Sequence, residues 1–236
     1  MHHLGQTRSA RRADHFLLTP DTFVRTPLPG MRGATGIVHV SPAAGARFTQ
    51  YTVEFERGGA LGTAAGQRFV YVLNGALRVN GRPLAVDGYA YFPAGCDAAV
   101  EAATAARAAV IEKTYVPLAG FDAPAMLLGE EGAIPAQALD GDPDLTVRAL
   151  LPASPAFDFA VNTMTYLPGA SLRMVEMHVM EHGLFMLEGG GIYRLGDSWY
   201  AVEKDDFIWM APWCPQWFGA LGKTPAKYLI YKDWNR

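Results

Sequence analysis

The sequence predicts an all-β protein made of two small antiparallel barrels or jelly rolls in tandem. Three observations support this prediction. Short apolar segments alternate with turn residues, no segment keeps a helical period over three turns, and one pattern of strands and turns occurs twice. The 236 residues include 25 Gly and 16 Pro, which favour tight turns between short strands. A chain of this length can form two hydrophobic cores.

Asn-Gly pairs give the clearest turn signals. Asn74-Gly75 and Asn80-Gly81 each follow a short apolar segment, and Asn-Gly between apolar segments favours a β-hairpin. We therefore expect strands over six apolar segments: 69–73, 76–79, 89–92, 184–187, 192–195 and 207–210.

The repeated pattern indicates a tandem duplication. Residues 70–75 read Val-Tyr-Val-Leu-Asn-Gly and parallel residues 184–189, which read Leu-Phe-Met-Leu-Glu-Gly; residues 84–92 likewise parallel residues 200–210. A full unit of strands and turns that occurs twice predicts two domains of one architecture. The expected boundaries give an arm, a first domain, a connection and a second domain: 1–30, 31–117, 118–145 and 146–236.

Charge and hydropathy exclude several classes of function. The formal net charge is −3 and basic residues form no long run, so we expect no nucleic-acid partner and no membrane partner. The apolar segments are far shorter than a membrane span, and the first residues lack an apolar signal region, so we expect a cytoplasmic protein. Cys96 and Cys214 are far apart in sequence and are expected to be unreactive thiols in a reducing compartment.

Four side chains in the second half form a candidate metal site. Glu176, His178 and His182 lie close together in sequence, and Gln216 follows about one hairpin later. Two imidazoles, a carboxylate and an amide oxygen suit an octahedral divalent ion with open positions, Mn²⁺ or Fe²⁺, rather than a closed structural Zn²⁺. Residues of the same parity share a face of a strand, so we expect Glu176 and His178 on one strand, pointing together into the second barrel.

The first half lacks these ligands. If Gly75 is aligned with Gly189, the three ligand positions before the turn are occupied by residues that do not suit this metal set: Gly62, Ala64 and Arg68. The first barrel is therefore expected to have no metal and to serve a structural or oligomerisation role. Arg68 could fill the former metal site with a fixed charge, or it could be an ordinary surface arginine.

The ligand spacing resembles the first motif of the cupins. That motif begins and ends with Gly and holds two His separated by one residue, followed by a third ligand. Here the corresponding residues are Gly169, Glu176, His178, His182 and Gly189. Glu takes the first ligand position, and Gln216 takes the place of the His that usually ends the second motif. The resemblance implies a bicupin, with two tandem cupin domains.

Longer segments resemble one bicupin family in particular, the (S)-ureidoglycine aminohydrolases. They are most specific within residues 176–236, and together they extend over nearly the whole chain. The matching segments are 12–20, 26–29, 182–200, 209–213, 215–217 and 228–236.

This resemblance implies a Mn²⁺ enzyme of allantoin and purine catabolism that releases ammonia from (S)-ureidoglycine and leaves (S)-ureidoglycolate. The metal ligands of the family correspond to residues present here: Glu176, His178, His182 and Gln216. The family also implies a homo-oligomer in which the C-terminal barrel is catalytic.

The same resemblance suggests the residues that act on the substrate. The substrate-contacting Lys of the family corresponds to Lys232 and its pocket Tyr to Tyr193, and we also expect Tyr228 and Gln216 to contact the substrate. Lys232 and Glu176 are the expected catalytic residues. Taken alone, Gln216 could be a buried hydrogen-bonding residue, Tyr193 a core residue with a satisfied hydroxyl, and Lys232 an exposed lysine.

Two other functions are compatible with these residues. The ligand set also accepts other divalent transition metals and could serve another metal-dependent cupin enzyme, such as a dioxygenase or an isomerase. A non-catalytic bicupin that binds a small molecule is the third possibility. The intact ligand set argues against it, and Lys232 with the specific C-terminal segment argues against the second.

Overall fold

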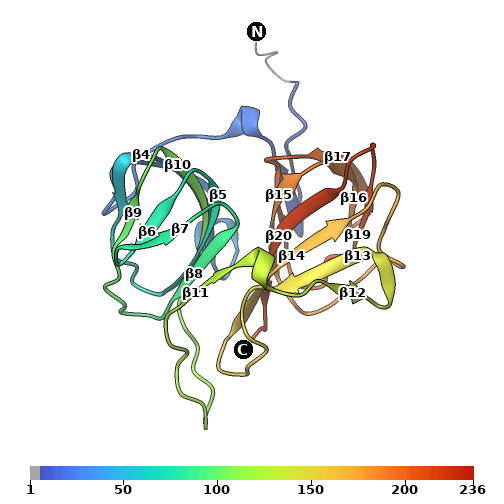
Figure 1. The fold of residues 1–236 in the computed structure, drawn as a ribbon. Helices are drawn as coiled ribbons and strands as arrows, with labels where there is room; N and C mark the ends of the chain where they lie inside the picture. The colour runs from blue at the N-terminus through green and yellow to red at the C-terminus, as the bar shows by residue number, and fades with distance from the viewer. Residues whose placement is uncertain (1–5) are drawn as a thin grey trace. The chain divides into compact units, whose positions relative to one another are not determined.

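The computed structural model describes residues 6–236, which form two compact units built almost entirely from β-strands (Figure 1). One unit, called the N-terminal barrel here, comprises Val24–Ile134 and Ser154–Asp158. The other, called the C-terminal barrel, comprises Pro135–Ala153, Phe159–Arg236 and the described residues before Val24. The predicted all-β fold with two barrels is confirmed. Helical structure in the described residues is limited to three short 3-10 turns: Pro20–Thr22, Pro42–Ala44 and Glu131–Ala133.

The strands of the N-terminal barrel are all antiparallel and curl around an apolar interior (Figure 1). The sheet runs β11-β8-β5-β10-β4-β9-β6-β7, and β3 also pairs with β4. Fully buried Val53, Val70 and Val110 come from three neighbouring strands and fill the core. The strands are β3 (Arg32–Val40), β4 (Thr49–Leu61), β5 (Gln67–Asn74), β6 (Leu77–Val79), β7 (Arg82–Leu84), β8 (Gly88–Phe92), β9 (Val100–Ala102), β10 (Ala106–Lys113) and β11 (Leu127–Glu130).

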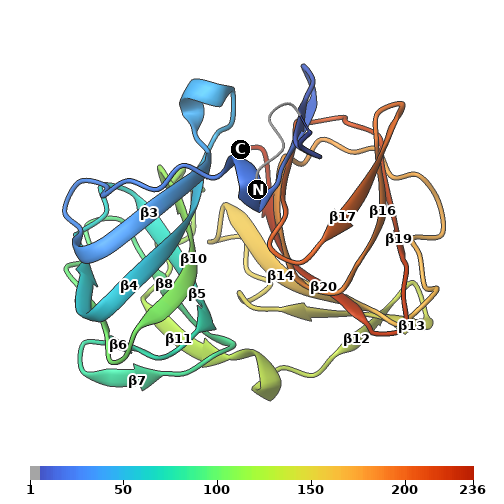
Figure 2. The ribbon, with the colours of Figure 1, turned by 90° about the horizontal axis from the view of Figure 1, so that it is seen from above.

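The C-terminal barrel consists of two sheets that share one core. The larger sheet runs β1-β2-β18-β15-β20-β14-β13-β12 and the smaller one β17-β16-β19 (Figure 2). Leu184 of the larger sheet and Phe218 of the smaller sheet belong to one buried cluster, so the sheets pack face to face. The strands are β1 (Ala10–Arg11), β2 (His15–Leu18), β12 (Gln137–Leu139), β13 (Asp142–Ala149), β14 (Phe159–Tyr166), β15 (His182–Glu188), β16 (Gly190–Leu195), β17 (Ser198–Glu203), β18 (Phe207–Met210), β19 (Gln216–Ala220) and β20 (Ala226–Asp233).

The segments expected to be an arm and a connection contain strands of the two barrels. In the expected arm, β2 pairs with β18 of the C-terminal barrel, while the chain from Val24 onward belongs to the N-terminal barrel. In the expected connection, β11 pairs with β8, and β12 and the start of β13 lie in the larger C-terminal sheet. These pairings occupy strand edges that would otherwise leave main-chain groups unpaired.

The two barrels repeat the same local pairings. β5 lies between β10 and β8, and β15 lies between β20 and β18. Gly75 and Gly189 follow these equivalent strands with φ of +72° and +62°. A Cβ at Gly75 would collide with the carbonyl oxygen of Ala105, and one at Gly189 would collide with that of Pro225. Both turns therefore require glycine for backbone conformation and for space.

The register of the central strands extends this equivalence to the candidate site. Arg68 on β5 lies opposite Glu112 on β10, and His182 on β15 lies opposite Lys232 on β20. The alignment that places Arg68 at the position of His182 therefore agrees with the strand register. The same register gives Glu112 and Lys232 equivalent positions in the two barrels, so an acidic residue in one corresponds to a basic residue in the other.

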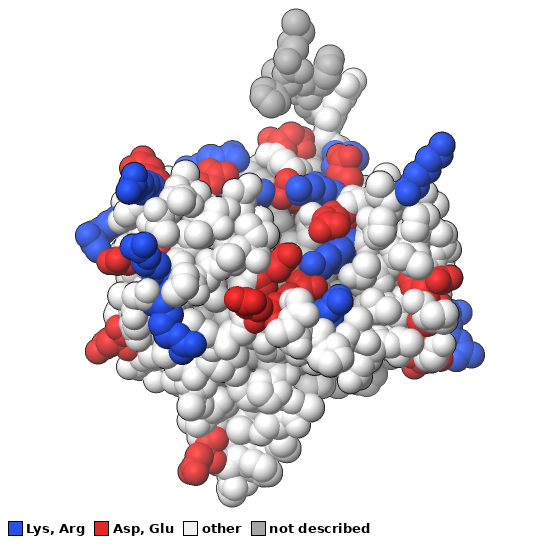
Figure 3. Space-filling view, viewed as in Figure 1, with Lys and Arg blue, Asp and Glu red and all other residues white. Residues whose placement is uncertain are grey.

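Charged side chains of both signs are interspersed on the face shown in Figure 3. Neighbouring charges of opposite sign screen each other, so this face has no extended field of one sign. The structure contains, in its described part, no helix long and apolar enough to cross a membrane.

An ion pair between Arg8 and a buried carboxylate fastens the N-terminal segment to the C-terminal barrel. Arg8 donates to both carboxylate oxygens of Asp206, at 2.6 and 3.0 Å, and Asp206 is fully buried in the turn before β18. Burial raises the pKa of Asp206, and the hydrogen bond and charge of Arg8 oppose that rise. Arg8 therefore favours the ionised form of a buried carboxylate.

We predict that Arg8→Ala lowers the free energy of unfolding at pH 7.5 by about 1–3 kcal/mol. The loss should fall below the roughly 3–5 kcal/mol of a fully buried pair, because Arg8 is partly exposed. A carboxyl group with a raised pKa in the folded state destabilises the fold when it ionises, so the loss should shrink as the pH falls and Asp206 takes up a proton. Urea unfolding at pH 7.5 and 5 measures both effects, with exposed Arg12→Ala as the control. An equal loss at both pH values would contradict this role.

Candidate metal centre

The structure brings the four predicted metal ligands together. His178 Nε2 lies 3.3 Å from His182 Nε2, 3.0 Å from Gln216 Nε2 and 3.9 Å from Glu176 Oε2. The four side chains line one cavity of about 50 Å³ in the C-terminal barrel, together with Tyr228 and Lys232 among others.

Main-chain hydrogen bonds hold the loop that carries Glu176 and His178. Glu176 and Gln216 exchange N–H···O bonds of 2.8 and 2.9 Å, and Trp213 N donates to His178 O at 2.8 Å. The expected strand through Glu176 and His178 is wrong, because Glu176 makes only an isolated bridge and bends on both sides interrupt the ladder. The two side chains therefore reach the same cavity from a loop that runs alongside β19, rather than from a strand.

The main chain fixes the tautomer of His182. His182 Nδ1 lies 3.0 Å from Tyr231 O, and a carbonyl oxygen only accepts, so Nδ1 carries a hydrogen. Burial lowers the pKa of His182 to about 3, helped by the charges of Lys232 and His178, so the ring is neutral. Its Nε2 therefore directs a lone pair at His178, as a metal-binding histidine does.

The Gln216 amide and His182 make opposite demands on His178. Its Nε2 faces the Nε2 lone pair of His182 and also the amide nitrogen of Gln216, which donates. A hydrogen on His178 Nε2 would suit His182 and oppose Gln216, and a lone pair would do the reverse. Its Nδ1 is buried without a hydrogen-bond partner among the described residues. A half-turn of the amide removes this conflict and brings the Gln216 oxygen, a possible ligand, next to the two imidazoles, so these residues fit a divalent metal ion.

Tyr193 controls the amide of Gln216. Its hydroxyl donates to Gln216 Oε1 at 3.1 Å, which turns the amide nitrogen toward His178. A half-turn of the amide would direct the oxygen toward His178 and the nitrogen toward the Tyr193 hydroxyl, which can also accept. Tyr193 is fully buried and does not line the cavity, so the structure places it behind Gln216. Tyr193 thus contacts a candidate ligand, and its expected direct contact with the substrate stays a prediction.

Lys232 and Tyr228 border the cavity from β20. Burial lowers the pKa of Lys232, and the negative charge of Glu176 opposes this shift. Burial raises the pKa of Tyr228 well above its usual value, and its hydroxyl lies 2.7 Å from that of Tyr166. The alternative of an ordinary exposed lysine is wrong for Lys232, because it is partly buried and faces the candidate ligands.

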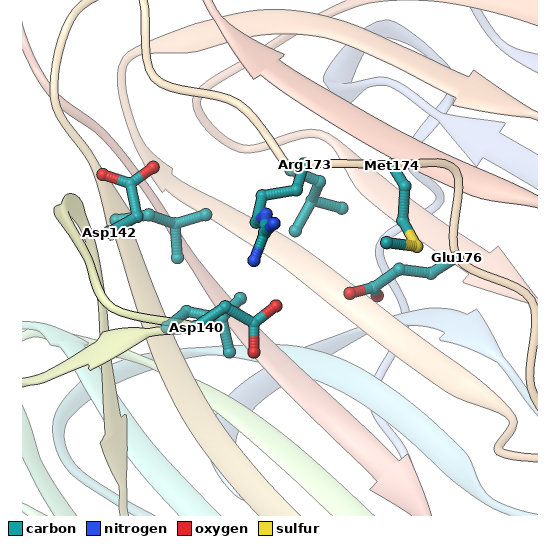
Figure 4. A pocket seen from close by; sticks show the side chains of 8 residues that line it. Asp140, Asp142, Arg173, Met174 and Glu176 are labelled. Atoms are coloured by element: carbon teal, nitrogen blue, oxygen red, sulfur yellow. The ribbon is translucent and has the colours of Figure 1, made fainter.

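Glu176 also lines a second, adjoining pocket of about 70 Å³. Figure 4 shows the Arg173 guanidinium and the Glu176 carboxylate directed into this pocket, with Asp140 on the opposite side. The Glu176 side chain is 39% exposed, so the carboxylate is accessible from outside the cavity of the histidines. The sequence did not indicate Arg173 or Asp140, because both lie in loops without a motif.

A further group of possible metal ligands consists of Asp14, His15 and Cys214. His15 Nδ1 lies 2.8 Å from Asp14 Oδ1 and 4.0 Å from Cys214 Sγ, and its Nε2 lies 2.8 Å from the Tyr200 hydroxyl. Both ring nitrogens therefore have protein partners. Burial raises the pKa of Cys214 to about 12, which keeps the thiol protonated. The sequence did not reveal this group, because its members meet only through the pairing of β2 with β18.

The fold and this cavity define the protein as a cupin, and residues 162–231 match the family model described as a cupin domain. Among solved structures, the chain is similar to the putative glyoxylate-induced protein from Pseudomonas aeruginosa, with a TM-score of 0.89 and 28% identity over 100% of this chain and 94% of that one. Protein Ylba from E. coli gives a TM-score of 0.86 and 28% identity over 99% and 96% of the two chains. A Bacillus subtilis oxalate decarboxylase structure, reported for its Mn(II) centres, shares the fold alone, with a TM-score of 0.72 and 10% identity over 98% and 80%.

Curated relatives identify the family. The chain is 41% identical to the probable (S)-ureidoglycine aminohydrolase of Oryza sativa subsp. japonica, over 98% of this chain and 77% of that protein. It is 38% identical to the (S)-ureidoglycine aminohydrolase of Arabidopsis thaliana, over 98% and 80%, and 31% identical to that of Escherichia coli, over 99% and 93%. The chain belongs to the (S)-ureidoglycine aminohydrolase family and is a hydrolase.

We predict that His178→Ala weakens Mn²⁺ binding by more than the roughly 10–100-fold that loss of a supporting group around a metal site costs. His178 contacts the other three candidate ligands, whereas the Asp14 group is satisfied without an ion. Titration of metal-free protein followed by the EPR signal of free Mn²⁺ measures the affinity. Cys214→Ser is the matched control and should bind as the wild type does. Loss of binding in Cys214→Ser with retention in His178→Ala would assign the metal to the group of Asp14, His15 and Cys214 instead.

Proposed function

We propose that this chain is a Mn²⁺-dependent aminohydrolase that converts (S)-ureidoglycine and water to (S)-ureidoglycolate and ammonia in purine catabolism. The observation that carries the proposal is the convergence of Glu176, His178, His182 and Gln216 on one cavity bordered by Lys232. Relatives named for this reaction support it over nearly the whole chain.

The four converging side chains would hold the ion through the Nε2 atoms of the histidines, a Glu176 oxygen and Gln216 Oε1. This set of nitrogen and oxygen donors suits Mn²⁺ and leaves coordination positions open for a small ligand. The bound ion would supply Lewis-acid polarisation and a fixed point for orienting the substrate.

Lys232 and Tyr228 recognise the substrate in this proposal. Ureidoglycine carries a carboxylate, an amine and a ureido group on one carbon, and the Lys232 ammonium is a compact partner for the carboxylate or the ureido oxygen. Tyr228 lies on the same strand and, because its position has the same parity as that of Lys232, offers its hydroxyl from the same face. Tyr193 acts through Gln216, whose amide it orients.

Glu176 handles the proton in this proposal. The reaction breaks the bond from carbon to the amine nitrogen and forms a bond from the same carbon to the oxygen of water. Water gives up a proton and the departing amine gains one, so a group that accepts and returns a proton serves both steps. The Glu176 carboxylate borders both pockets, and an oxygen that does not hold the ion stays free for this transfer.

We predict that Lys232→Met lowers kcat/KM for ammonia release by about 30-fold or more, as expected for loss of a charged partner in a largely desolvated site. Methionine keeps the length of the side chain and removes its charge. Release of ammonia from freshly prepared ureidoglycine by Mn²⁺-loaded protein is the measurement, and Lys223→Met in an exposed loop is the control. Unchanged activity in Lys232→Met would remove Lys232 from the site. Oxygen uptake without ammonia release would contradict the proposed reaction itself.

We predict that Glu176→Gln lowers kcat by about 10²–10⁴-fold, the range for loss of a general acid–base group, while a measurable part of the Mn²⁺ affinity remains. The amide oxygen of glutamine can still face the ion, but it does not accept a proton near neutral pH. The assay uses Mn²⁺ concentrations that saturate each variant, so that altered metal affinity does not appear as altered turnover. A metal-saturated variant with nearly normal turnover would show that Glu176 only holds the ion.

A further inference from the structure

The N-terminal barrel keeps a cavity where its twin has the candidate metal site. This cavity has a volume of about 420 Å³, against about 50 Å³ for the cavity of the C-terminal barrel. It lies in the size range of small-molecule sites. Arg68 and Glu112 line it at the register positions that His182 and Lys232 occupy in the C-terminal barrel. The N-terminal barrel thus has an arginine and a glutamate where its twin has a candidate metal ligand and a lysine, and it keeps a larger cavity there.

One oxygen of Glu112 makes all the hydrogen bonds at this position. Arg68 Nε and a terminal nitrogen of Arg68 each lie 2.7 Å from Glu112 Oε1, and the Tyr51 hydroxyl donates to the same oxygen at 2.7 Å. The other terminal nitrogen of Arg68 donates to Gly62 O at 2.7 Å. Glu112 Oε2 receives no hydrogen bond from the described residues, and the Glu112 side chain is 27% exposed. A residue that lines the cavity therefore keeps an unused acceptor oxygen.

Arg68 keeps donors as well. A guanidinium has five N–H groups, and the bonds to Glu112 Oε1 and Gly62 O use three of them. Two N–H groups therefore remain on a side chain that is only 8% exposed and that lines the cavity.

The chemistry of this pair selects a neutral ligand with a donor next to an acceptor. A carboxylate would suit Arg68 but would face Glu112 Oε2, and an ammonium group would suit Glu112 but would face Arg68. A urea or primary amide has a carbonyl oxygen for Arg68 and an N–H for Glu112 in one plane. The remaining cavity wall is largely apolar, with Leu28, Met31 and Leu61.

We propose that the N-terminal barrel holds a second, metal-independent binding site for a small neutral molecule with a urea or primary amide group and a short apolar body. Arg68 donates to its carbonyl oxygen and Glu112 Oε2 accepts from its nitrogen. All the residues of the site lie within the N-terminal barrel, so binding does not depend on the metal centre or on the proposed reaction.

Three probes that share a butyl chain test this proposal on the full chain: n-butylurea, pentanoate and n-butylammonium. Saturation-transfer NMR with metal-free wild-type protein should show n-butylurea binding at least tenfold more tightly than either charged probe, which corresponds to about 1.4 kcal/mol. Tighter binding of pentanoate or butylammonium would overturn the ligand class. The absence of binding by all three would overturn the site.

Two variants locate the binding. Ala64 lines the cavity from the loop before β5, so Ala64→Trp should fill the space and reduce n-butylurea affinity at least tenfold. His178→Ala disables the candidate metal site and should leave that affinity unchanged. The opposite result, with loss in His178→Ala and retention in Ala64→Trp, would assign the ligand to the C-terminal barrel. Thermal unfolding of both variants establishes that each is folded.

A third variant tests the chemistry. Glu112→Gln removes the charge beside Arg68 and keeps the shape of the side chain. Pentanoate should then bind at least tenfold more tightly than to wild type, because the carboxylate meets Arg68 without an opposing charge. An unchanged pentanoate affinity would show that the Arg68 and Glu112 pair does not contact the ligand.

Discussion

The antiparallel register of β15 against β20 is the constraint on which the candidate metal centre depends. It places His182 opposite Lys232 and leaves Tyr231 O to receive the hydrogen of His182 Nδ1. The same main-chain ladder therefore sets the position, the tautomer and the charged neighbour of one imidazole. A shift of the register by one residue would place His182 and Lys232 on opposite faces of the sheet, so they would no longer border the same cavity.

That constraint also explains how the two barrels could diverge. Register depends on the main chain and the turn glycines, and each barrel keeps a glycine with positive φ at the equivalent turn, Gly75 in one and Gly189 in the other. The side chains at the register positions are then free to change. His182 is neutral and offers a lone pair to a metal ion, whereas Arg68 and Glu112 form an ion pair with each other. The N-terminal pair is thus charge-balanced by itself, and the cavity beside it remains open.

The sequence predicts what local patterns encode. Two histidines and a glutamate at fixed spacing, and glycines after apolar segments, are short-range features, and the ligand set and the two-barrel fold follow from them. It does not predict contacts that depend on distant pairing. The Asp14, His15 and Cys214 group forms because β2 lies against β18, and a strand pair so far apart in sequence has no local signal. The expected strand through Glu176 is wrong for a related reason: its loop pairs with β19 only at an isolated bridge, and this contact with a segment distant in sequence has no local signal.

Tyr193 shows how a core residue can set the chemistry of a site that it does not line. A buried hydroxyl needs a partner, and Tyr193 finds it in the oxygen of Gln216. Because a hydroxyl both donates and accepts, Tyr193 can hydrogen-bond either the oxygen or the nitrogen of the amide. With the oxygen held by Tyr193, Gln216 presents a donor to His178; with the nitrogen held, it presents an acceptor suited to a cation. The buried hydroxyl would thereby allow Gln216 to hold the proposed ion through its oxygen without a movement of the main chain of β19.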